Sequence, residues 1–242
     1  MLSTEQQQHF ISAGYVVLHE FFAESEMIAL KKEAQNIVEQ FDSRSTRSVF
    51  STQDQSKSRD DYFLQSGDKV RCFFEEEAFD QSGELKQAKA VSINKIGHAL
   101  HVLNPVFKKF SHDLRIRQVA KDVGLIEPQI HQSMYIFKQP KIGGVIRWHQ
   151  DGTYFLSDPL SVVTFWFAVE DATIENGCLQ IKADGSDTPL REQFVRYADD
   201  STDLKVLDST PWPKDEEAQP LEVTKGSLVV FDGLLPHFSA PN

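Results

Sequence analysis

The sequence predicts a mainly β protein, a sandwich or barrel flanked by helices, in a single domain over residues 1–242. Short apolar, β-branched and aromatic runs alternate with Gly, Pro and Asn turns through the second half of the chain. A length of 242 residues suits one such domain, and 40% hydrophobic residues, with 18 Phe among them, can fill a sizeable core. The first half instead carries apolar residues at helical spacing.

The first half is expected to form a scaffold of helices and one strand. Ser3 and Gln6 form a capping-box pattern that opens a helix ending at Gly14. In order, the elements that follow are a strand over 15–18 and helices over 25–41, 93–103 and 111–123. The polar stretch 43–61 is expected to be a surface loop, which either closes over the site or is an ordinary connection.

The second half is expected to supply the core strands. Residues 162–169 are the longest β-branched and aromatic run in the chain, and Asn176-Gly177 marks a tight turn. The expected strands cover 129–138, 145–151, 162–169, 178–181 and 226–231. The polar residues 183–219 are expected to form a long insert between core strands, and therefore a candidate substrate-selecting region.

Three residues carry the strongest functional signal. His149 and Asp151, spaced i, i+2 in an extended segment, point to the same side of the backbone, and the distant His237 can complete a metal site. Two His and one carboxylate with open positions are typical of non-haem Fe(II) oxygenases. A His-x-Asp pair alone is a weak signal, and from the triad alone a cupin-like zinc hydrolase or isomerase is also possible. His98 and His101, expected on one helix face without a third ligand, are assigned structural or surface roles.

A family resemblance extends along nearly the whole chain. Six stretches carry it in order: 61–75, 92–101, 132–140, 149–151, 168–179 and 236–242. In these stretches the chain resembles the phytanoyl-CoA dioxygenase family. The resemblance implies a double-stranded β-helix, the jelly-roll core of cupins, flanked by helices. It also implies Fe(II) held by His149, Asp151 and His237, with 2-oxoglutarate as cosubstrate and O2 as oxidant.

By the same resemblance, 2-oxoglutarate lies near Lys95, Met134 and Trp166, and Gln150 belongs to the cofactor-binding segment. The first three have plain structural alternatives. Lys95 falls in an expected helix and could be solvated, whereas Met134 is most often a core filler and Trp166 is by default a core residue. Ascorbate could support activity.

Two departures from the family bear on the cosubstrate and the substrate. Family members normally carry an Arg about nine or more residues after the distal His, where a guanidinium suits the far carboxylate of 2-oxoglutarate. This sequence ends at Asn242, so that Arg and the last core strand are expected to be lacking. The chain is then a fragment, a natural short form with impaired cosubstrate binding, or one in which Lys95 or Arg147 supplies the cation. The second departure is at residues 183–187. Relatives usually carry Pro-Gly-Ser-His soon after the position of Leu179, whereas this chain reads Ala183-Asp-Gly-Ser-Asp187.

Composition argues against several classes of protein. The net charge is −11 and Lys and Arg are scattered, which disfavours a nucleic-acid partner. The Glu75-Glu76-Glu77 run is expected to be a solvated face. Cys72 and Cys178 lack metal-type spacing, are expected to be buried, and fit a reducing cytoplasm. No signal peptide or membrane-spanning run is evident, and the sequence does not indicate an oligomeric state.

Together these observations predict an Fe(II)- and 2-oxoglutarate-dependent dioxygenase that acts on a small molecule. The implied reaction is oxidative decarboxylation of 2-oxoglutarate to succinate and CO2, coupled to hydroxylation of a substrate that the sequence does not identify. CoA phosphates would favour a basic entrance, and the chain shows no obvious basic cluster. The alternative is a non-catalytic or impaired metal- or ligand-binding short form without the anchoring Arg.

Overall fold

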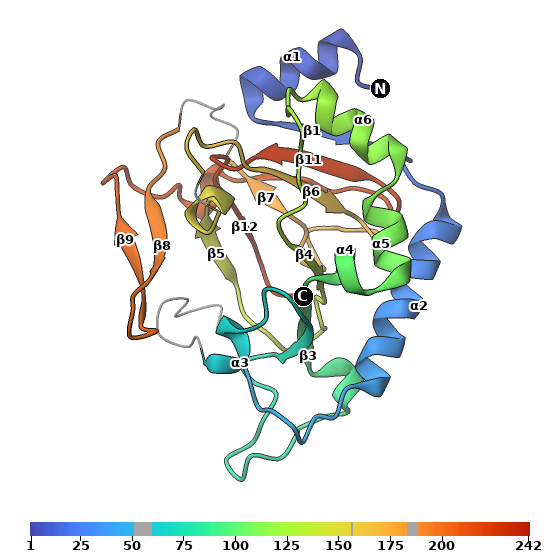
Figure 1. Ribbon diagram of the computed structural model, residues 1–242, viewed down its shortest axis with the longest axis vertical. Helices are drawn as coiled ribbons and strands as arrows, with labels where there is room; N and C mark the ends of the chain where they lie inside the picture. The colour runs from blue at the N-terminus through green and yellow to red at the C-terminus, as the bar shows by residue number, and fades with distance from the viewer. Residues whose placement is uncertain (51–59, 156, 183–187) are drawn as a thin grey trace.

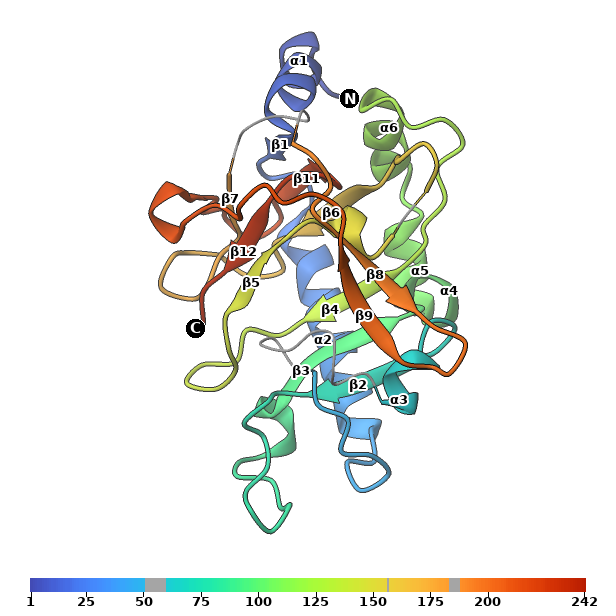
Figure 2. The same cartoon turned by 90° about the vertical axis from the view of Figure 1, so that its left-hand side faces the viewer.

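The computed structural model describes residues 1–50, 60–155, 157–182 and 188–242. Its centre is a jelly-roll of two facing antiparallel sheets, with helices along one side and a projecting hairpin on the other (Figure 1). A view turned by 90° places the hairpin in front of the sheets and the long helix behind them (Figure 2). The predicted fold class, mainly β with flanking helices around a jelly-roll, is confirmed.

The helices confirm most of the expected scaffold. Ser3 and Gln6 form the predicted capping box, in which each side chain accepts a hydrogen bond from the backbone N–H of the other. The helix they open ends at Gly14, whose φ of 80° is the left-handed conformation that favours Gly. The α-helices are α1 (Thr4–Ala13), α2 (Glu24–Gln40), α3 (Asp61–Leu64), α4 (Leu100–Leu103), α5 (Pro105–Ser111) and α6 (Leu114–Asp122). The described part of the chain also forms the short 3-10 turns η1 (Lys89–Val91), η2 (Asp151–Thr153) and η3 (Asp215–Glu217).

In the described residues the strands pair in four antiparallel groups. In chain order they are β1 (Tyr15–Leu18), β2 (Val70–Phe74), β3 (Ile93–His98), β4 (Ser133–Ile136), β5 (Ile146–His149), β6 (Val163–Phe167), β7 (Gln180–Ile181), β8 (Glu192–Arg196), β9 (Thr202–Val206), β10 (Gln219–Pro220), β11 (Leu228–Asp232) and β12 (His237–Ser239). The two core sheets have the orders β1-β11-β6 and β10-β7-β12-β5. Strands β2-β3-β4 form a third sheet, and β8-β9 form the projecting hairpin.

Two strand registers bring distant parts of the chain to one place. Between β5 and β12, His149 lies opposite His237. Between β6 and β11, Thr164 lies opposite Phe231, and the Phe231 ring is centred 4.8 Å from the His237 ring. Residues from both core sheets therefore meet around these two histidines.

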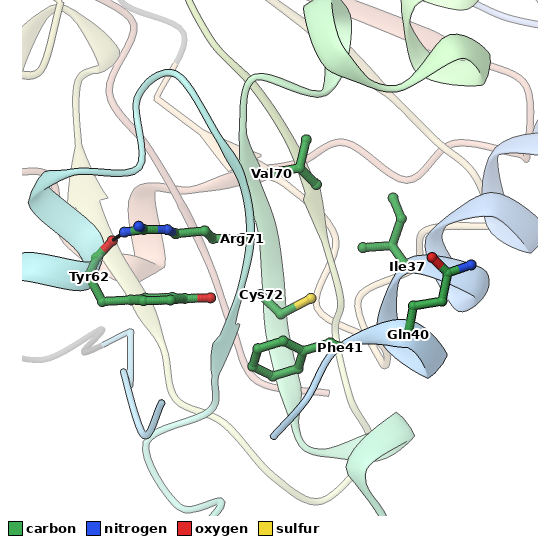
Figure 3. A pocket seen from close by; sticks show the side chains of 7 residues that line it. All are labelled: Ile37, Gln40, Phe41, Tyr62, Val70, Arg71 and Cys72. Carbon is green, nitrogen blue, oxygen red and sulfur yellow. Dashed lines mark hydrogen bonds between the residues drawn. The ribbon is translucent and has the colours of Figure 1, made fainter. Parts of the chain in front are cut away.

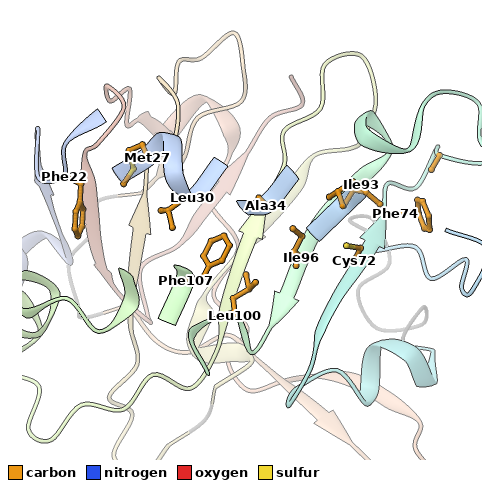
Figure 4. Close-up of a cluster of buried hydrophobic side chains, with 12 residues drawn as sticks. Phe22, Met27, Leu30, Ala34, Cys72, Phe74, Ile93, Ile96, Leu100 and Phe107 are labelled. Atoms are coloured by element: carbon orange, nitrogen blue, oxygen red, sulfur yellow. The ribbon is translucent and has the colours of Figure 1, made fainter. Parts of the chain in front are cut away.

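A buried cluster fixes α2 against the third sheet (Figure 4). The apolar residues of α2 that recur at helical spacing are Met27, Leu30, Ala34 and Val38, and each is at most 3% exposed. They pack with Cys72 and Phe74 of β2 and with Ile93 and Ile96 of β3. A second cluster lies between the core sheets, with Ile181 of β7 and Val229 of β11 among its members. Phe167 of β6 also packs against the first cluster, which therefore joins the third sheet to a core sheet.

The helix expected over 93–103 is wrong for most of its length. Residues Ile93–His98 form β3, which is paired on both sides and buried at every position, and only the last part of the segment is helical, as α4. A buried strand has no exposed face, so its apolar residues need not alternate and can imitate helical spacing. His98 and His101 therefore lie in different elements. Both are buried, and their Nδ1 atoms contact the hydroxyl groups of Ser66 and Ser133 at 2.7 and 2.8 Å.

The prediction that Glu75-Glu76-Glu77 forms a solvated face is wrong for Glu75. Glu75 is 2% exposed because it directly continues buried β2, and only Glu77 of the three is exposed. Asn94 Nδ2 donates a hydrogen bond of 2.8 Å to the Glu75 carboxylate, and burial raises the pKa of this carboxyl. The burial expected for Cys72 and Cys178 is confirmed.

The two long polar segments are only partly described. Of the predicted loop 43–61, residues 51–59 lie outside the described residues. The closure of this loop over the site therefore stays a prediction. Residues 183–187, the second departure from the family, also lie outside the described residues. The remainder of the expected insert 183–219 contains the β8–β9 hairpin and η3. Among the described residues, no helix has the length and apolar character needed to cross a bilayer.

Candidate metal centre

His149, Asp151 and His237 converge, as the sequence predicts. Their possible ligand atoms all lie within 4.8 Å of one another, and within the described ranges no other group of three His, Cys, Asp or Glu does so. Nε2 of His149 and Nε2 of His237 are each 3.7 Å from the same oxygen, Oδ1 of Asp151. Their side chains are only 6 to 17% exposed, so these donor atoms are largely withdrawn from water.

The local backbone explains how His149, at the end of β5, and Asp151, just beyond it, come to the same place. The expected strand 145–151 stops at His149, and Asp151 begins the 3-10 turn η2. Gln150 keeps an extended conformation, with φ −123° and ψ 135°. Residues on either side of an extended residue project to the same side of the chain. His149 and Asp151 therefore share one side although the strand ends between them.

Backbone carbonyls fix the tautomer of both imidazoles. Nδ1 of His149 lies 2.9 Å from the carbonyl of Arg147, and Nδ1 of His237 lies 2.9 Å from the carbonyl of Leu235. Because a carbonyl can only accept, each Nδ1 carries the hydrogen and each Nε2 keeps the lone pair that a metal needs. Burial, followed by the neighbouring His237, lowers the pKa of His149 below its usual range, so the ring stays neutral. A neutral imidazole is the form that binds a metal.

Thr164 of β6 orients the carboxylate, and sequence reasoning missed it. Its Oγ1 donates a hydrogen bond to Oδ2 of Asp151, which leaves Oδ1 directed at the two imidazoles. Outer partners of this kind orient metal-binding carboxylates. The only sequence signal was a Thr in the same strand as Trp166, at the i, i+2 spacing of one strand face.

Gln150 is placed away from the three ligands. It is fully buried, and its amide group makes three hydrogen bonds: two to the carbonyls of Pro189 and Leu234 and one from the N–H of Arg191. Each of these three bonds is made to a backbone group. We therefore expect Gln150 to position the segments around the site rather than to contact the cosubstrate.

Lys95 and Met134 lie on neighbouring strands of the third sheet. The register pairs Lys95 with Ile136 and Gly97 with Met134, so both side chains project from the same face. Lys95 is 4% exposed and its Nζ is 3.1 Å from the centre of the Phe50 ring, which contradicts the solvated helical residue considered from sequence. Burial and the neighbouring His237 are the main causes that lower the pKa of His149, and the charge of Lys95 is a smaller one.

The other residues predicted to lie near the cosubstrate have different environments. Met134 is 43% exposed and is therefore not a core filler. Trp166 shares a face of β6 with Thr164 and packs against the cluster between the core sheets. Arg147 is exposed. Cosubstrate contacts by Lys95, Met134 and Trp166 stay predictions.

The donor set fits a divalent iron ion. Two imidazole nitrogens and one carboxylate oxygen converge from one side, and this 2-His-1-carboxylate arrangement is typical of non-haem Fe(II) sites, in which other positions remain for further ligands. The fixed tautomers and the Thr164 hydrogen bond add the outer contacts that such sites usually have. The residues present are therefore suited to hold the metal.

A separate shallow pocket lies between α2 and β2 (Figure 3). Its lining residues are Ile37, Gln40, Phe41, Tyr62, Val70, Arg71 and Cys72. None of them belongs to the metal cluster. Burial raises the pKa of the Cys72 thiol to about 12, and a thiol that stays protonated is a poor nucleophile. The metal cluster, not this pocket, is therefore the candidate functional site.

Solved structures of low sequence identity share this fold. A structure of the carbocyclase SnoK, described as non-heme and alpha ketoglutarate dependent, is similar with a TM-score of 0.66 and 17% identity, and the match covers 100% of this chain and 78% of that one. A structure of EctD from S. alaskensis with 2-oxoglutarate and 5-hydroxyectoine is similar with a TM-score of 0.62 and 20% identity, over 100% and 71% of the two chains. These likenesses support the jelly-roll fold.

Relatives of higher identity and a family model define the family. A protein of Caenorhabditis elegans named phytanoyl-CoA dioxygenase domain-containing protein 1 homolog is 41% identical, over 98% of this chain and 84% of its own length. The Mus musculus protein of the corresponding name is 38% identical, over 100% and 85%. The family model for phytanoyl-CoA dioxygenase (PhyH) matches residues 10–242. The chain therefore belongs to the phytanoyl-CoA dioxygenase family, whose members are 2-oxoglutarate-dependent non-haem iron dioxygenases.

Proposed function

We propose that this protein is an Fe(II)- and 2-oxoglutarate-dependent dioxygenase that hydroxylates a small organic molecule. The observation that carries the proposal is the convergence of His149, Asp151 and His237, in which Nε2 of each histidine lies 3.7 Å from the same carboxylate oxygen. Membership of the phytanoyl-CoA dioxygenase family supports it. When bound, iron would couple the oxidative decarboxylation of 2-oxoglutarate to succinate and CO2 with oxidation of the substrate by O2.

In this proposal the residues of the chain bind and orient. His149, Asp151 and His237 hold the metal, while Thr164 and two backbone carbonyls fix the direction of the ligands. Lys95 is a buried cation beside this cluster, and a buried ammonium suits a carboxylate of the cosubstrate. Met134 projects from the same face of the third sheet, and Trp166 lies on the same strand face as Thr164; these placements support the predicted cosubstrate contacts.

The substrate side is assigned to the β8–β9 hairpin and η2. Phe194 of β8 contacts Tyr154 at the end of η2, with ring centres 6.0 Å apart, so the hairpin lies next to the turn that carries Asp151. This contact supports the role of the insert in selecting the substrate. A CoA ester is not proposed, because the sequence shows no obvious basic cluster for its phosphates. The two free, buried thiols, Cys72 and Cys178, support a reducing cytoplasm as the compartment.

The test is succinate formation from 2-oxoglutarate with Fe(II) and ascorbate in the absence of another substrate. We expect slow turnover that His149→Ala abolishes and that His19→Ala, a change at an exposed histidine, leaves intact. No turnover with iron still bound would contradict the dioxygenase proposal and favour a non-catalytic metal-binding form. Preferential zinc binding with hydrolytic activity that is lost in Asp151→Ala would favour a zinc enzyme instead.

A further inference from the structure

Tyr154 lies on the same side of its turn as the metal-binding carboxylate. It follows η2 directly, and its backbone N–H donates to the carbonyl of Asp151 at 3.0 Å. In a 3-10 turn the side chains at i and i+3 eclipse each other, so the side chains of Asp151 and Tyr154 project in the same direction. The Tyr154 ring is centred 6.3 Å from the His149 ring, at an interplanar angle of 66°. A phenol therefore lies beside two of the three metal-binding residues.

Tyr154 is not needed to fill the core. It is only partly buried, and none of the three buried clusters of the described residues includes it. A second ring neighbour is Phe194 of the projecting hairpin, which also lies outside these clusters. The ring thus occupies the space between the metal cluster and the hairpin assigned to substrate selection.

We propose that Tyr154 is a self-modification site, the ring that the iron-loaded protein oxidises when no substrate covers it. The inference rests on the proposed function. In the reaction, a ring carbon next to the phenol carbon gains an oxygen atom in its C–H bond and the ring becomes a catechol. O2 supplies this oxygen, the second oxygen atom of O2 enters succinate, and 2-oxoglutarate loses CO2. In normal turnover a bound substrate shields the ring by lying against it.

Phe231 and Met134 are less suited to this reaction. Phe231 is close to His237, but it is 2% exposed, packs in the cluster between the core sheets and lacks the electron-donating hydroxyl of Tyr. Met134 has a readily oxidised thioether, but it is 43% exposed, so oxidants in bulk solution reach it whether or not metal is bound. Dependence on the metal ligands is therefore the property that identifies the Tyr154 reaction.

The first experiment is peptide mass spectrometry after incubation with Fe(II), 2-oxoglutarate and isotopically labelled O2, with succinate measured in the same samples. We expect one labelled oxygen atom on the peptide that contains Tyr154, in step with succinate, and its loss in Asp151→Ala and in Tyr154→Phe. Succinate without oxidation at Tyr154 would overturn this inference and leave the proposed function intact.

A second experiment does not depend on 2-oxoglutarate turnover. Fe(II), ascorbate and hydrogen peroxide oxidise groups close to bound iron, and Tyr197, which is 52% exposed on the same hairpin, is an internal control for oxidation from solution. We expect Tyr154 to be modified in preference to Tyr197, and the preference to disappear in Asp151→Ala. This result without succinate formation would reject the proposed activity but support Tyr154 as the side chain that bound iron reaches. Preferential oxidation of Tyr197 would overturn the inference.

Discussion

The side-chain amide of Gln150 donates a hydrogen bond of 2.7 Å to the backbone carbonyl of Leu234, shortly before His237. The same amide donates to the carbonyl of Pro189 at 2.9 Å, and its oxygen accepts from the N–H of Arg191 at 2.9 Å. One buried side chain, placed between His149 and Asp151 in the sequence, therefore joins three segments. It links the segment that supplies His149 and Asp151 to the turn before His237 and to the chain that leads into β8.

Replacing Gln150 with Leu should destabilise the protein through these three bonds. Leu has a similar size but removes the partner of one buried N–H and of two carbonyls whose bonds are partly buried. Because each unsatisfied buried group costs about 1–3 kcal/mol, we expect the free energy of unfolding to fall by roughly 3 kcal/mol. Urea denaturation without metal measures this loss.

The matched control for this variant is Gln35→Leu, at an exposed position of α2. We expect a change within about 0.5 kcal/mol there, as for most surface substitutions. Equal stability of the two variants would show that the Gln150 network is dispensable.

Gly177 should not tolerate a side chain. Its φ is 77°, and a Cβ there would lie 2.4 Å from the carbonyl oxygen of Ala240, in the segment after β12. The left-handed conformation alone costs roughly 1–2 kcal/mol for Ala, and the clash adds to it, so we expect Gly177→Ala to lose at least about 2 kcal/mol. Gly67→Ala is the control, because no atom lies within 4 Å of its Cβ position and its φ is not left-handed. Thermal denaturation of both variants checks the prediction, which fails if they melt together.

Lys138 should make the stability of the protein depend on alkaline pH. Burial lowers its pKa to about 8 from 10.5, although the carboxylate of Glu75 and the thiol group of Cys178 act in the opposite direction. Between these two pKa values the unfolded chain binds the proton that the folded protein has released. The free energy of unfolding therefore gains a contribution that rises with pH across this window, and below it both states hold the proton.

Lys138→Met should remove this contribution, so its stability should fall behind that of the wild type as pH rises from 8 towards 10.5. Denaturation at a series of pH values measures the difference. Lys109→Met, at an exposed lysine, should run parallel to the wild type. Parallel curves for Lys138→Met as well would show that Lys138 titrates alike in both states.

Local signals predicted the parts of this structure that depend on neighbouring residues in the sequence. The Ser3 capping box and Gly14 mark both ends of α1 because each acts on its own turn of helix. The spacing of Met27, Leu30 and Ala34 marks the buried face of α2 for the same reason. The His149-x-Asp151 spacing places two donors on one side of an extended chain, and the structure brings His237 to them.

Features that depend on distant pairing were not predictable in this way. Ile93–His98 is a strand because β2 and β4 pair with both of its edges, and its own apolar spacing suits a helix equally well. Glu75 is buried because β2 carries it inward, next to Asn94 of the paired strand. Thr164 contacts the carboxylate of Asp151 only after the two core sheets have assembled, because Thr164 lies in β6 of one sheet and Asp151 follows β5 of the other. No local pattern marks such contacts.

Thr164 offers the most direct test of how the carboxylate is oriented. Thr164→Val keeps the branched shape of the side chain but removes the hydroxyl that donates to Oδ2 of Asp151. The carboxylate can then rotate, and Oδ1 is no longer held toward the two imidazoles. Loss of an outer partner of a metal ligand typically lowers metal affinity about 10- to 100-fold, and we expect a loss in this range for Fe(II) measured anaerobically. Thr164→Ser, which restores the hydroxyl, should recover most of the affinity, whereas equal Fe(II) affinity of the Val variant and the wild type would show that the backbone alone orients Asp151.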